Sequence, residues 1–412
     1  MKERVQTKPI LDSYRVLDLT DEKGSFCGKI LGDLGADVIK IEKPGGDPAR
    51  NVGPFYHDIP DPEKSLSWMY CNSSKRGITL DIEAAAARDI FKRLVRTADF
   101  LIESFTPGYM ERMGLGYEAV SAINPGIVFT SVTPFGQNGP YKDYEIADIV
   151  LWAMGGIMHT CGDRDRAPLR CSIPQAYYFG GLQAATGSMV AHYHRQLTGE
   201  GQYVDVSIQE SVLINVPNSV MAWDLFKRNT MRSEGMRIRM LYPCKDGRVV
   251  CSIGGTGVGW TQSTIALTNW MAEEGMASEL ADIDWSNFDP AAVTPEQVQR
   301  AEEVLGAFFL TKTKQELYQA AIERGFSLAP SSTPKDLVED AQLAARGFFI
   351  EVEHPELSDT ISYAGAPLQM SHHAWSIRGR APLIGEHNEE VYERELGLSH
   401  EQRAILKSDG VI

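Results

Sequence analysis

The stretch from Arg15 to Glu42, RVLDLTDEKGSFCGKILGDLGADVIKIE, decides the fold. Residues 15–19 alternate between apolar and polar side chains, as a strand does. A helical stretch follows from Phe26 to Leu34 and stops at Gly35, and residues 36–42 form a second apolar strand. Strand, helix and strand within about 30 residues make a βαβ unit, which predicts a parallel sheet.

The same pattern continues along the first ~150 residues. Residues 78–81 are short and extended, and residues 82–95 place their apolar side chains on one helical face. Two further apolar strands are expected at residues 100–102 and 126–132, before a helix at about 180–196 and a strand at 203–208. We predict a doubly wound α/β domain.

The middle of the chain has a different character. Trp- and Met-rich helices surround one strand pair near residues 243–252, which predicts a smaller α+β domain. Residues 327–334 (SLAPSSTP) are typical of a linker. Strand-like segments at 360–363 and 368–370 suggest that the tail returns to the first domain. The predicted domain bounds are 1–205 and 335–412 for the large domain and 221–329 for the small one.

Composition and charge exclude several function classes. The 412 residues carry 40 Lys plus Arg and 55 Asp plus Glu, a formal net charge of −15, with 43% hydrophobic and 23% charged residues. This is the balance of a globular protein. An acidic chain is a poor candidate for nucleic acid, and any anionic ligand needs a local group of cations.

Localisation and metal binding are also constrained. The charged N-terminus lacks the apolar segment of a signal peptide, and no stretch is long and apolar enough to span a membrane. The six cysteines are scattered without a C-x-x-C pair, which suits free thiols in the cytoplasm. No motif indicates a metal site, since His192 and His194 would point to different faces of a helix.

Several cations cluster near the ends of the predicted elements of the first domain. They are Lys43, Lys75 with Arg76, Arg112 and Lys142. A single surface cation is usually only solvated. Ligands of open α/β sheets, however, bind at the carboxyl ends of strands, where we place these loops. The set therefore favours a phosphorylated ligand such as a nucleotide diphosphate.

At this point the chain resembles the class III CoA-transferases, the CaiB/BaiF family, over nearly its whole length. The resemblance rests on eight motifs: RVLDLT (15–20), LGADVIKIEKPGGDPAR (34–50), SKRGITLD (74–81), ADFLIESFTPG with ERMGLG (98–116), NPGIVFTSVTPFGQNGP (124–140), TGEGQ (198–202), ARGFF (345–349) and APLIGEH (381–387).

The resemblance implies a fold and a ligand. Members are interlocked dimers, in which each chain has a Rossmann-like large domain built from both termini and a smaller middle domain. Their ligand is coenzyme A or an acyl-CoA, used as substrate, with a carboxylic acid as the second substrate and no metal. The family's CoA contacts map onto Lys43, Lys75 with Arg76, Ser104, Arg112 with Met113, and Lys142.

One departure from the family concerns the catalytic residue. Family transferases use an aspartate that attacks the acyl-CoA and becomes an aspartyl-CoA thioester, from which CoA passes to a second acid. Here Tyr177 stands at that position, and residues 167–183 contain no Asp or Glu. Tyrosine is protonated at neutral pH and cannot replace the carboxylate. Asp163 and Asp165, upstream, are expected to be surface residues.

Three functions remain open. The first is the non-catalytic subunit of a heteromeric class III CoA-transferase, whose paralogous partner carries the aspartate. Such an enzyme would move CoA from a donor such as succinyl-CoA to an acid such as an aryl-succinate, in anaerobic aromatic degradation. The second is an active homodimeric CoA-transferase or acyl-CoA isomerase with another nucleophile. The third is a CoA-ester binding protein without catalysis.

Overall fold

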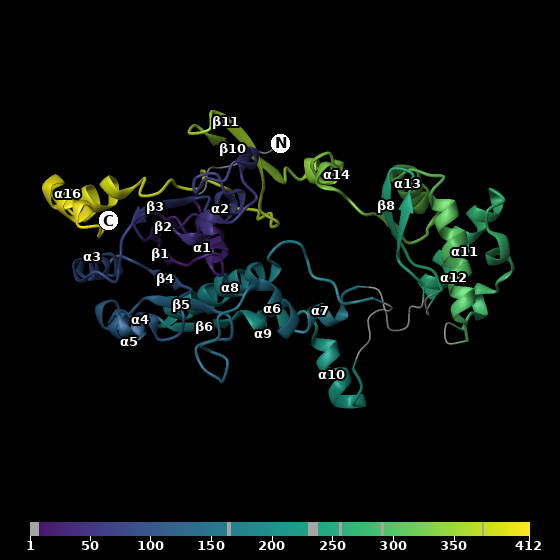
Figure 1. Cartoon of the computed structure of the whole chain (residues 1–412), viewed down its shortest axis with the longest axis horizontal. Coiled ribbons are helices and arrows are strands. Elements are labelled where there is room, and N and C mark those ends of the chain that lie inside the picture. The colour runs from purple at the N-terminus through teal and green to yellow at the C-terminus, as the bar shows by residue number, and fades with distance from the viewer. Residues whose placement is uncertain (1–7, 163–165, 230–237, 255–257, 290–291, 373–374) are drawn as a thin grey trace. The chain divides into compact units, whose positions relative to one another are not determined.

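The computed structural model describes residues 8–162, 166–229, 238–254, 258–289, 292–372 and 375–412. By its internal contacts the chain divides into two compact units. Unit 1 contains residues 1–158, 170–218 and 346–412, and unit 2 contains residues 159–169 and 219–345. Figure 1 labels the elements of both.

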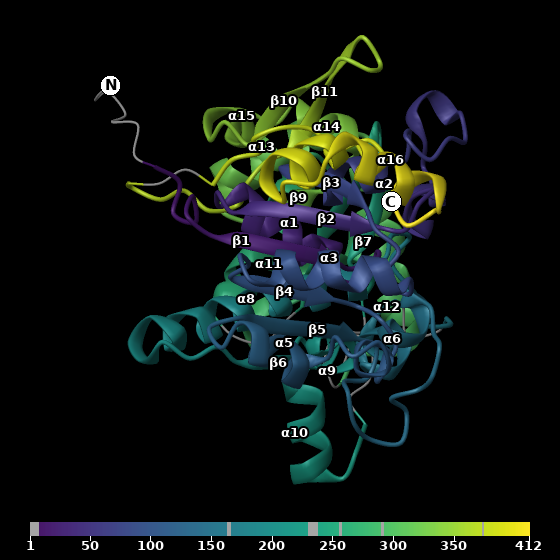
Figure 2. The same cartoon turned by 90° about the vertical axis from the view of Figure 1, so that its left-hand side faces the viewer.

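Unit 1 is built on a six-stranded parallel sheet with the order β3-β2-β1-β4-β5-β6. Figure 2 shows the strands one below another in this order. The strands are β1 (Arg15–Leu19), β2 (Asp37–Glu42), β3 (Lys75–Thr79), β4 (Phe100–Glu103), β5 (Val128–Thr133) and β6 (Tyr203–Ser207). The predicted α/β class and parallel sheet are confirmed.

Helices cover both faces of this sheet, because its strands are apolar on both sides. One face packs on α1 (Ser25–Asp33), α6 (Asp148–Met154), α8 (Gln175–Thr198) and α9 (Ile208–Leu213). The other packs on α3 (Ala85–Val95), α4 (Tyr109–Arg112), α5 (Tyr117–Ile123), the π-helix η5 (Glu390–Glu395) and α16 (His400–Ser408).

Shorter elements complete the described part of unit 1. They are η1 (Pro48–Asn51), η2 (Tyr56–Asp58), α2 (Leu66–Cys71) and the antiparallel pair β10 (Phe349–His354) and β11 (Asp359–Ala364). The helices α7 (Ile157–Thr160) and α10 (Pro217–Phe226) lie where the chain passes from one unit to the other.

Unit 2 has its own apolar core around a three-stranded antiparallel sheet of order β7-β8-β9. Its strands are β7 (Leu241–Cys244), β8 (Gly247–Cys251) and β9 (Leu328–Pro330). Its helices are α11 (Val258–Glu273), η3 (Ser278–Asp282), η4 (Trp285–Asn287), α12 (Pro295–Phe309), α13 (Lys314–Arg324), α14 (Pro334–Val338) and α15 (Ala341–Ala345).

Four local predictions need correction. The linker predicted at 327–334 is wrong, because β9 lies inside it and pairs with β8. Residues 368–370 form no strand. The strand predicted at 78–81 is β3, which begins three residues earlier, at Lys75. The helix predicted at 180–196 is α8, which begins at Gln175 and so carries Tyr177 in its first turn. The predicted interlocked dimer requires a second chain and stays a prediction.

Candidate functional site

A cavity of about 590 Å³ lies at the carboxyl edge of the sheet in unit 1. Its walls come from the carboxyl ends of β1 to β4 and the segments that follow them, and β1 and β4 are neighbours in the sheet. From this pair the strand order runs outward in opposite directions, towards β3 and towards β6. Such a switch point opens a crevice where α/β proteins bind ligands.

A buried lysine supports the loop that follows β1. The ammonium of Lys75 donates to the Asp18 carboxylate (2.7 Å), to the Ser25 carbonyl oxygen (2.9 Å) and to the Asn72 amide oxygen (2.8 Å). The side chains of Lys75 and Asp18 are both 0% exposed. Since an ammonium group has three donors, Lys75 has none left for a phosphate.

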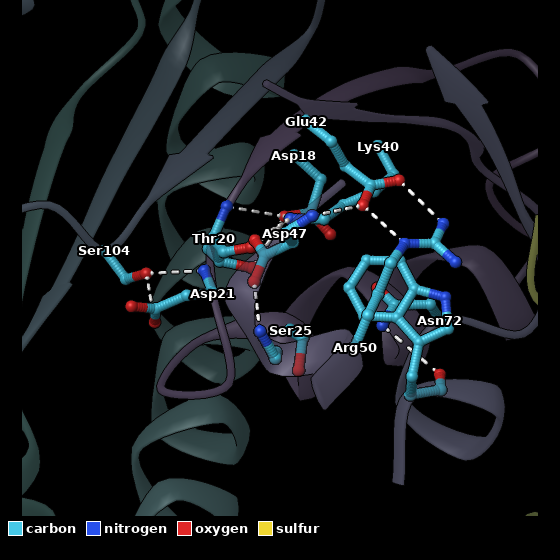
Figure 3. Close-up of polar contacts among 12 residues, drawn as sticks. Asp18, Thr20, Asp21, Ser25, Lys40, Glu42, Asp47, Arg50, Asn72 and Ser104 are labelled. Carbon is cyan, nitrogen blue, oxygen red and sulfur yellow. Dashed lines mark hydrogen bonds and ion pairs between the residues drawn. The ribbon is translucent and has the colours of Figure 1, made fainter. Parts of the chain in front are cut away.

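Two further buried cations lie beside it (Figure 3). Lys40 donates to the carbonyl oxygen of Thr20 and lies 3.5 Å from the carboxylate of Asp47. Arg50 donates twice to the Glu42 carboxylate, at 2.7 and 2.8 Å. Each buried charge has an opposite charge at hand, which the low interior dielectric requires.

Burial alone would raise the pKa of Asp18, but the ammonium groups of Lys75 and Lys40 outweigh it and hold that pKa below its usual value. The carboxylates Asp18, Asp47 and Glu42 likewise outweigh burial and raise the pKa of Lys40. The charged forms of Asp18 and Lys40 are thus favoured, whereas burial lowers the pKa of Lys75 and raises that of Asp47. The hydrogen bonds of the cluster fix the backbone that it binds.

Hydrogen bonds fix the loop after β1 at Thr20 and Asp21, near its start, and at Ser25, where α1 begins. Thr20 donates to the Asp18 carboxylate from its amide (2.9 Å) and its hydroxyl (2.6 Å). Ser104 Oγ accepts from the Asp21 amide and donates to the Asp21 carboxylate, both at 2.8 Å. Between these anchors Glu22 is exposed, and it lines the cavity.

A second, smaller pocket of about 70 Å³ adjoins the large cavity, and we call it the inner pocket. The two share Glu22, Ala49 and Val52 as lining residues. The remaining lining residues of the inner pocket are Ser25, Phe26, Gly53, Ser67, Trp68, Cys71, Asn72, Pro174, Tyr177 and Tyr178. Its walls are mainly apolar and aromatic, which suits the acyl end of a ligand.

Tyr177, at the predicted aspartate position, lies in the wall of the inner pocket and is 7% exposed. It belongs to the first turn of α8, whose amides at Ala176 (2.7 Å) and Tyr177 (3.3 Å) donate to the carboxylate of Asp148. Burial and the nearby carboxylates of Glu22 and Asp148 raise the pKa of Tyr177 far above neutrality. The side chain is thus a neutral phenol.

The predicted CoA-binding residues divide into those that follow β2, β4 and β5, described first, and the pair Lys75 and Arg76 in β3. Lys43 and Ser104 line the large cavity, where Lys43 also pairs with Glu83 at 2.9 Å. Arg112 is exposed and lies 6.0 Å from the ring of Tyr109, which lines the same cavity. Met113 packs on the core beneath α4, and Lys142 is exposed in the loop before α6.

The placement of Lys75 and Arg76 in a loop at the carboxyl edge is wrong. Both belong to the first half of β3, in register with Val38 and Ile39 near the start of β2. Arg76 donates to Asp37 (2.7 Å), Glu390 (2.8 Å) and Glu395 (2.5 Å), and it lines a different cavity at the amino edge. Both cations thus form ion pairs with carboxylates of residues distant in sequence.

Several residues of the site escaped sequence reasoning. Glu22 is one. The buried acid Glu103, which ends β4 and precedes the lining residue Ser104, was also missed. Glu103 is 4% exposed, and its burial raises its pKa to about 7 although Ser131 and the Phe105 amide bond to it. An acid that ends the apolar run FLIE is the only signal that could have suggested it. Phe105 and Tyr109, stacked with centroids 4.4 Å apart, form an aromatic wall of the large cavity.

The described residues contain no cluster of three or more metal-ligating side chains. A membrane-spanning helix is likewise not found among them. Asp163 and Asp165, expected to be surface residues, lie outside the described residues.

These features, a parallel sheet with a cavity at its switch point and a pocket beside α8, define a class of protein. The model of CoA-transferase family III matches residues 11–388, and the chain belongs to this family. A solved structure of a CAIB/BAIF family protein from Brucella suis is similar, with a TM-score of 0.80 and 27% identity, over 94% of this chain and 100% of that one.

Curated relatives are named as CoA-transferases. The chain is 35% identical to subunit BbsE of succinyl-CoA:(R)-benzylsuccinate CoA-transferase from Thauera aromatica, over 92% of each. It is 32% identical to formyl-CoA:oxalate CoA-transferase from Streptomyces avermitilis, over 98% of this chain and 99% of the relative. It is 31% identical to succinyl-CoA–D-citramalate CoA-transferase from Chloroflexus aurantiacus, over 98% of each.

Proposed function

We propose that this chain is the non-catalytic subunit of a heteromeric class III CoA-transferase, and that a paralogous partner carries the nucleophilic aspartate. The observation that carries the proposal is Tyr177, a buried neutral phenol at the position where the family's nucleophile is expected. A phenol attacks a thioester poorly at neutral pH, and an aryl ester would not reproduce the exchange between carboxylates.

The relatives agree with this proposal. BbsE is named as a subunit, which indicates an enzyme of more than one kind of chain. By analogy, the heteromer would move CoA between succinyl-CoA and a carboxylic acid such as an aryl-succinate, as in anaerobic aromatic degradation. The six cysteines are free thiols, which favours the cytoplasm as the place of action.

In this proposal the large cavity receives coenzyme A. Lys43, Arg112 and Lys142 supply positive charge to the phosphates, while Ser104 and Met113 shape the edge. Lys75 and Arg76 contribute indirectly, because their hydrogen bonds fix the sheet and the loop after β1. Thioester and acid are the substrates, and no step depends on a metal.

Co-expression with a family paralogue from the same organism tests the proposal. We expect a stable complex that transfers CoA from succinyl-CoA, whereas this chain purified alone forms no product. Replacing the partner's aspartate by asparagine should abolish the activity of the complex. A fully active preparation of this chain alone would overturn the proposal.

A further inference from the structure

Among the described residues that line both cavities, Glu22 is the acidic one. It lines both cavities together with Ala49 and Val52, so a ligand that reaches from the large cavity into the inner pocket passes these three residues. A pantetheine chain with its thioester at the end has the shape for such a path, because it is narrow and extended.

Glu22 differs from the other acidic residues of the large cavity. Within the described part of the chain its carboxylate forms no ion pair or hydrogen bond that the structure shows. The other three are each paired with a cation: Asp21 with Lys23, Glu42 with Arg50, and Asp47 with Lys40. The Glu22 charge is therefore the one that a ligand meets.

The loop that carries Glu22 is anchored on both sides. Lys40 holds the Thr20 carbonyl, Ser104 holds Asp21, and Lys75 holds the Ser25 carbonyl. These anchors are buried, so the loop cannot move aside without breaking bonds to buried charges. The backbone at Glu22 thus keeps its place when a ligand approaches.

The inner pocket offers nothing to balance a second negative charge. Its lining, among the described residues, includes no Lys, Arg or His, and its largest side chains are Phe26, Trp68, Tyr177 and Tyr178. A carboxylate that entered would lose its hydration without gaining a counter-ion, and it would lie close to Glu22.

We propose that Glu22 is a specificity-determining residue, which makes this chain bind CoA thioesters with an uncharged apolar acyl group and reject those whose acyl group carries a free carboxylate. This inference rests on the proposed function, in that the large cavity receives CoA. In the heteromer, succinyl-CoA and an aryl-succinyl-CoA, which each keep one free carboxylate, are then both left to the partner's site.

Calorimetric titration of the full chain with butyryl-CoA and succinyl-CoA tests the inference, since both acyl groups have four carbons. We expect butyryl-CoA to bind on the order of tenfold more tightly, the effect of one like charge a few ångströms away near a protein surface. Glu22→Gln should reduce this preference to about threefold or less by strengthening the binding of succinyl-CoA. Glu200→Gln, in the exposed turn before β6, is the matched control and should keep the preference.

Equal affinity of the unaltered chain for both thioesters would overturn the inference, as would an unchanged preference in Glu22→Gln or the absence of binding by either thioester. Complex formation with the paralogue, measured on the same variants, keeps this outcome separate from the proposed function. Glu22→Gln should still form the complex. An unaltered chain that pairs normally with the paralogue but binds both thioesters equally would refute the role of Glu22 and leave the proposed function standing.

Discussion

At the scale of single residues, the proposed function has Tyr177 in place of the family's nucleophile. The first turn of α8 around it is held by the Asp148 carboxylate, and the loop after β1 is fixed by Lys75. In the proposal, an ordered site therefore surrounds a phenol that does not react. This combination is what a subunit retained for binding and assembly requires.

Lys75 and Lys43 are expected to respond differently to the same substitution. Lys75→Met leaves Asp18 buried beside only the more distant Lys40 (3.9 Å), so the free energy of unfolding should fall by roughly 3–5 kcal/mol. Lys43→Met removes a half-exposed cation and should change stability by less than about 0.5 kcal/mol while weakening CoA binding.

Denaturant unfolding and calorimetric titration of both variants measure the two effects. Adding Asp18→Leu to Lys75→Met should restore part of the lost stability, because it removes the unpaired charge. Unchanged stability in Lys75→Met would show that this buried pair does not hold the loop.

Glu103 should make stability depend on pH. Its pKa is raised in the folded protein to about 7, so the folded state holds the proton more tightly than the unfolded state. The sign follows: stability is highest below the ordinary pKa of a glutamate and falls as the pH rises to about 7.

Glu103→Gln keeps the shape and cannot ionise, so it should be more stable than the unaltered chain at pH 8, and its advantage should be smaller at pH 5. The difference between the two advantages is roughly 2–3 kcal/mol. Urea unfolding at both pH values measures it, with Glu200→Gln as the control. An advantage of equal size at the two pH values would contradict a raised pKa.

Among the described elements, α10 exposes many of its apolar side chains. Five of its ten residues are apolar and more than half exposed: Val220, Met221, Trp223, Leu225 and Phe226. Exposed apolar groups gathered on one short helix are typical of a protein interface. We therefore expect this helix to be covered by the partner subunit.

Trp223→Glu should weaken the complex with the paralogue by at least about tenfold, since a large aromatic side chain at an interface commonly contributes more than 1.4 kcal/mol. Asp224→Ala, on the same helix and also exposed, is the control and should leave the complex intact. Co-purification and analytical ultracentrifugation report the result. Normal assembly of Trp223→Glu would exclude α10 from the interface.

Elements also show what the sequence could predict. Periodicity located β1, α1 and β2 closely, because each buries apolar side chains at a regular spacing. It misplaced the start of β3, because two consecutive cations, Lys75 and Arg76, have the polar character of a loop in the sequence. Those partners lie 57 and 314 residues away in sequence, at Asp18 and Glu390, and local patterns carry no such information.

At the scale of the whole molecule, the net charge of −15 required any anion site to be local. The structure brings Lys43 to the cavity at the switch point. Among the acids that line this cavity, Glu42 and Asp47 are paired with buried cations and Asp21 with Lys23, which leaves Glu22 as the exception among the described residues. The position of that cavity could be predicted from the parallel sheet alone. The inner pocket could not, because its walls come from α1, α2 and α8, which are distant in sequence.

The central claim is that this chain contributes no nucleophile to the heteromer. The most direct test is to incubate the complex with acyl-CoA, trap the covalent enzyme–CoA thioester and map it by mass spectrometry on both chains. The account predicts an adduct on an aspartate of the partner and none on this chain. An adduct on this chain, at Glu22 or at any other residue, would contradict it.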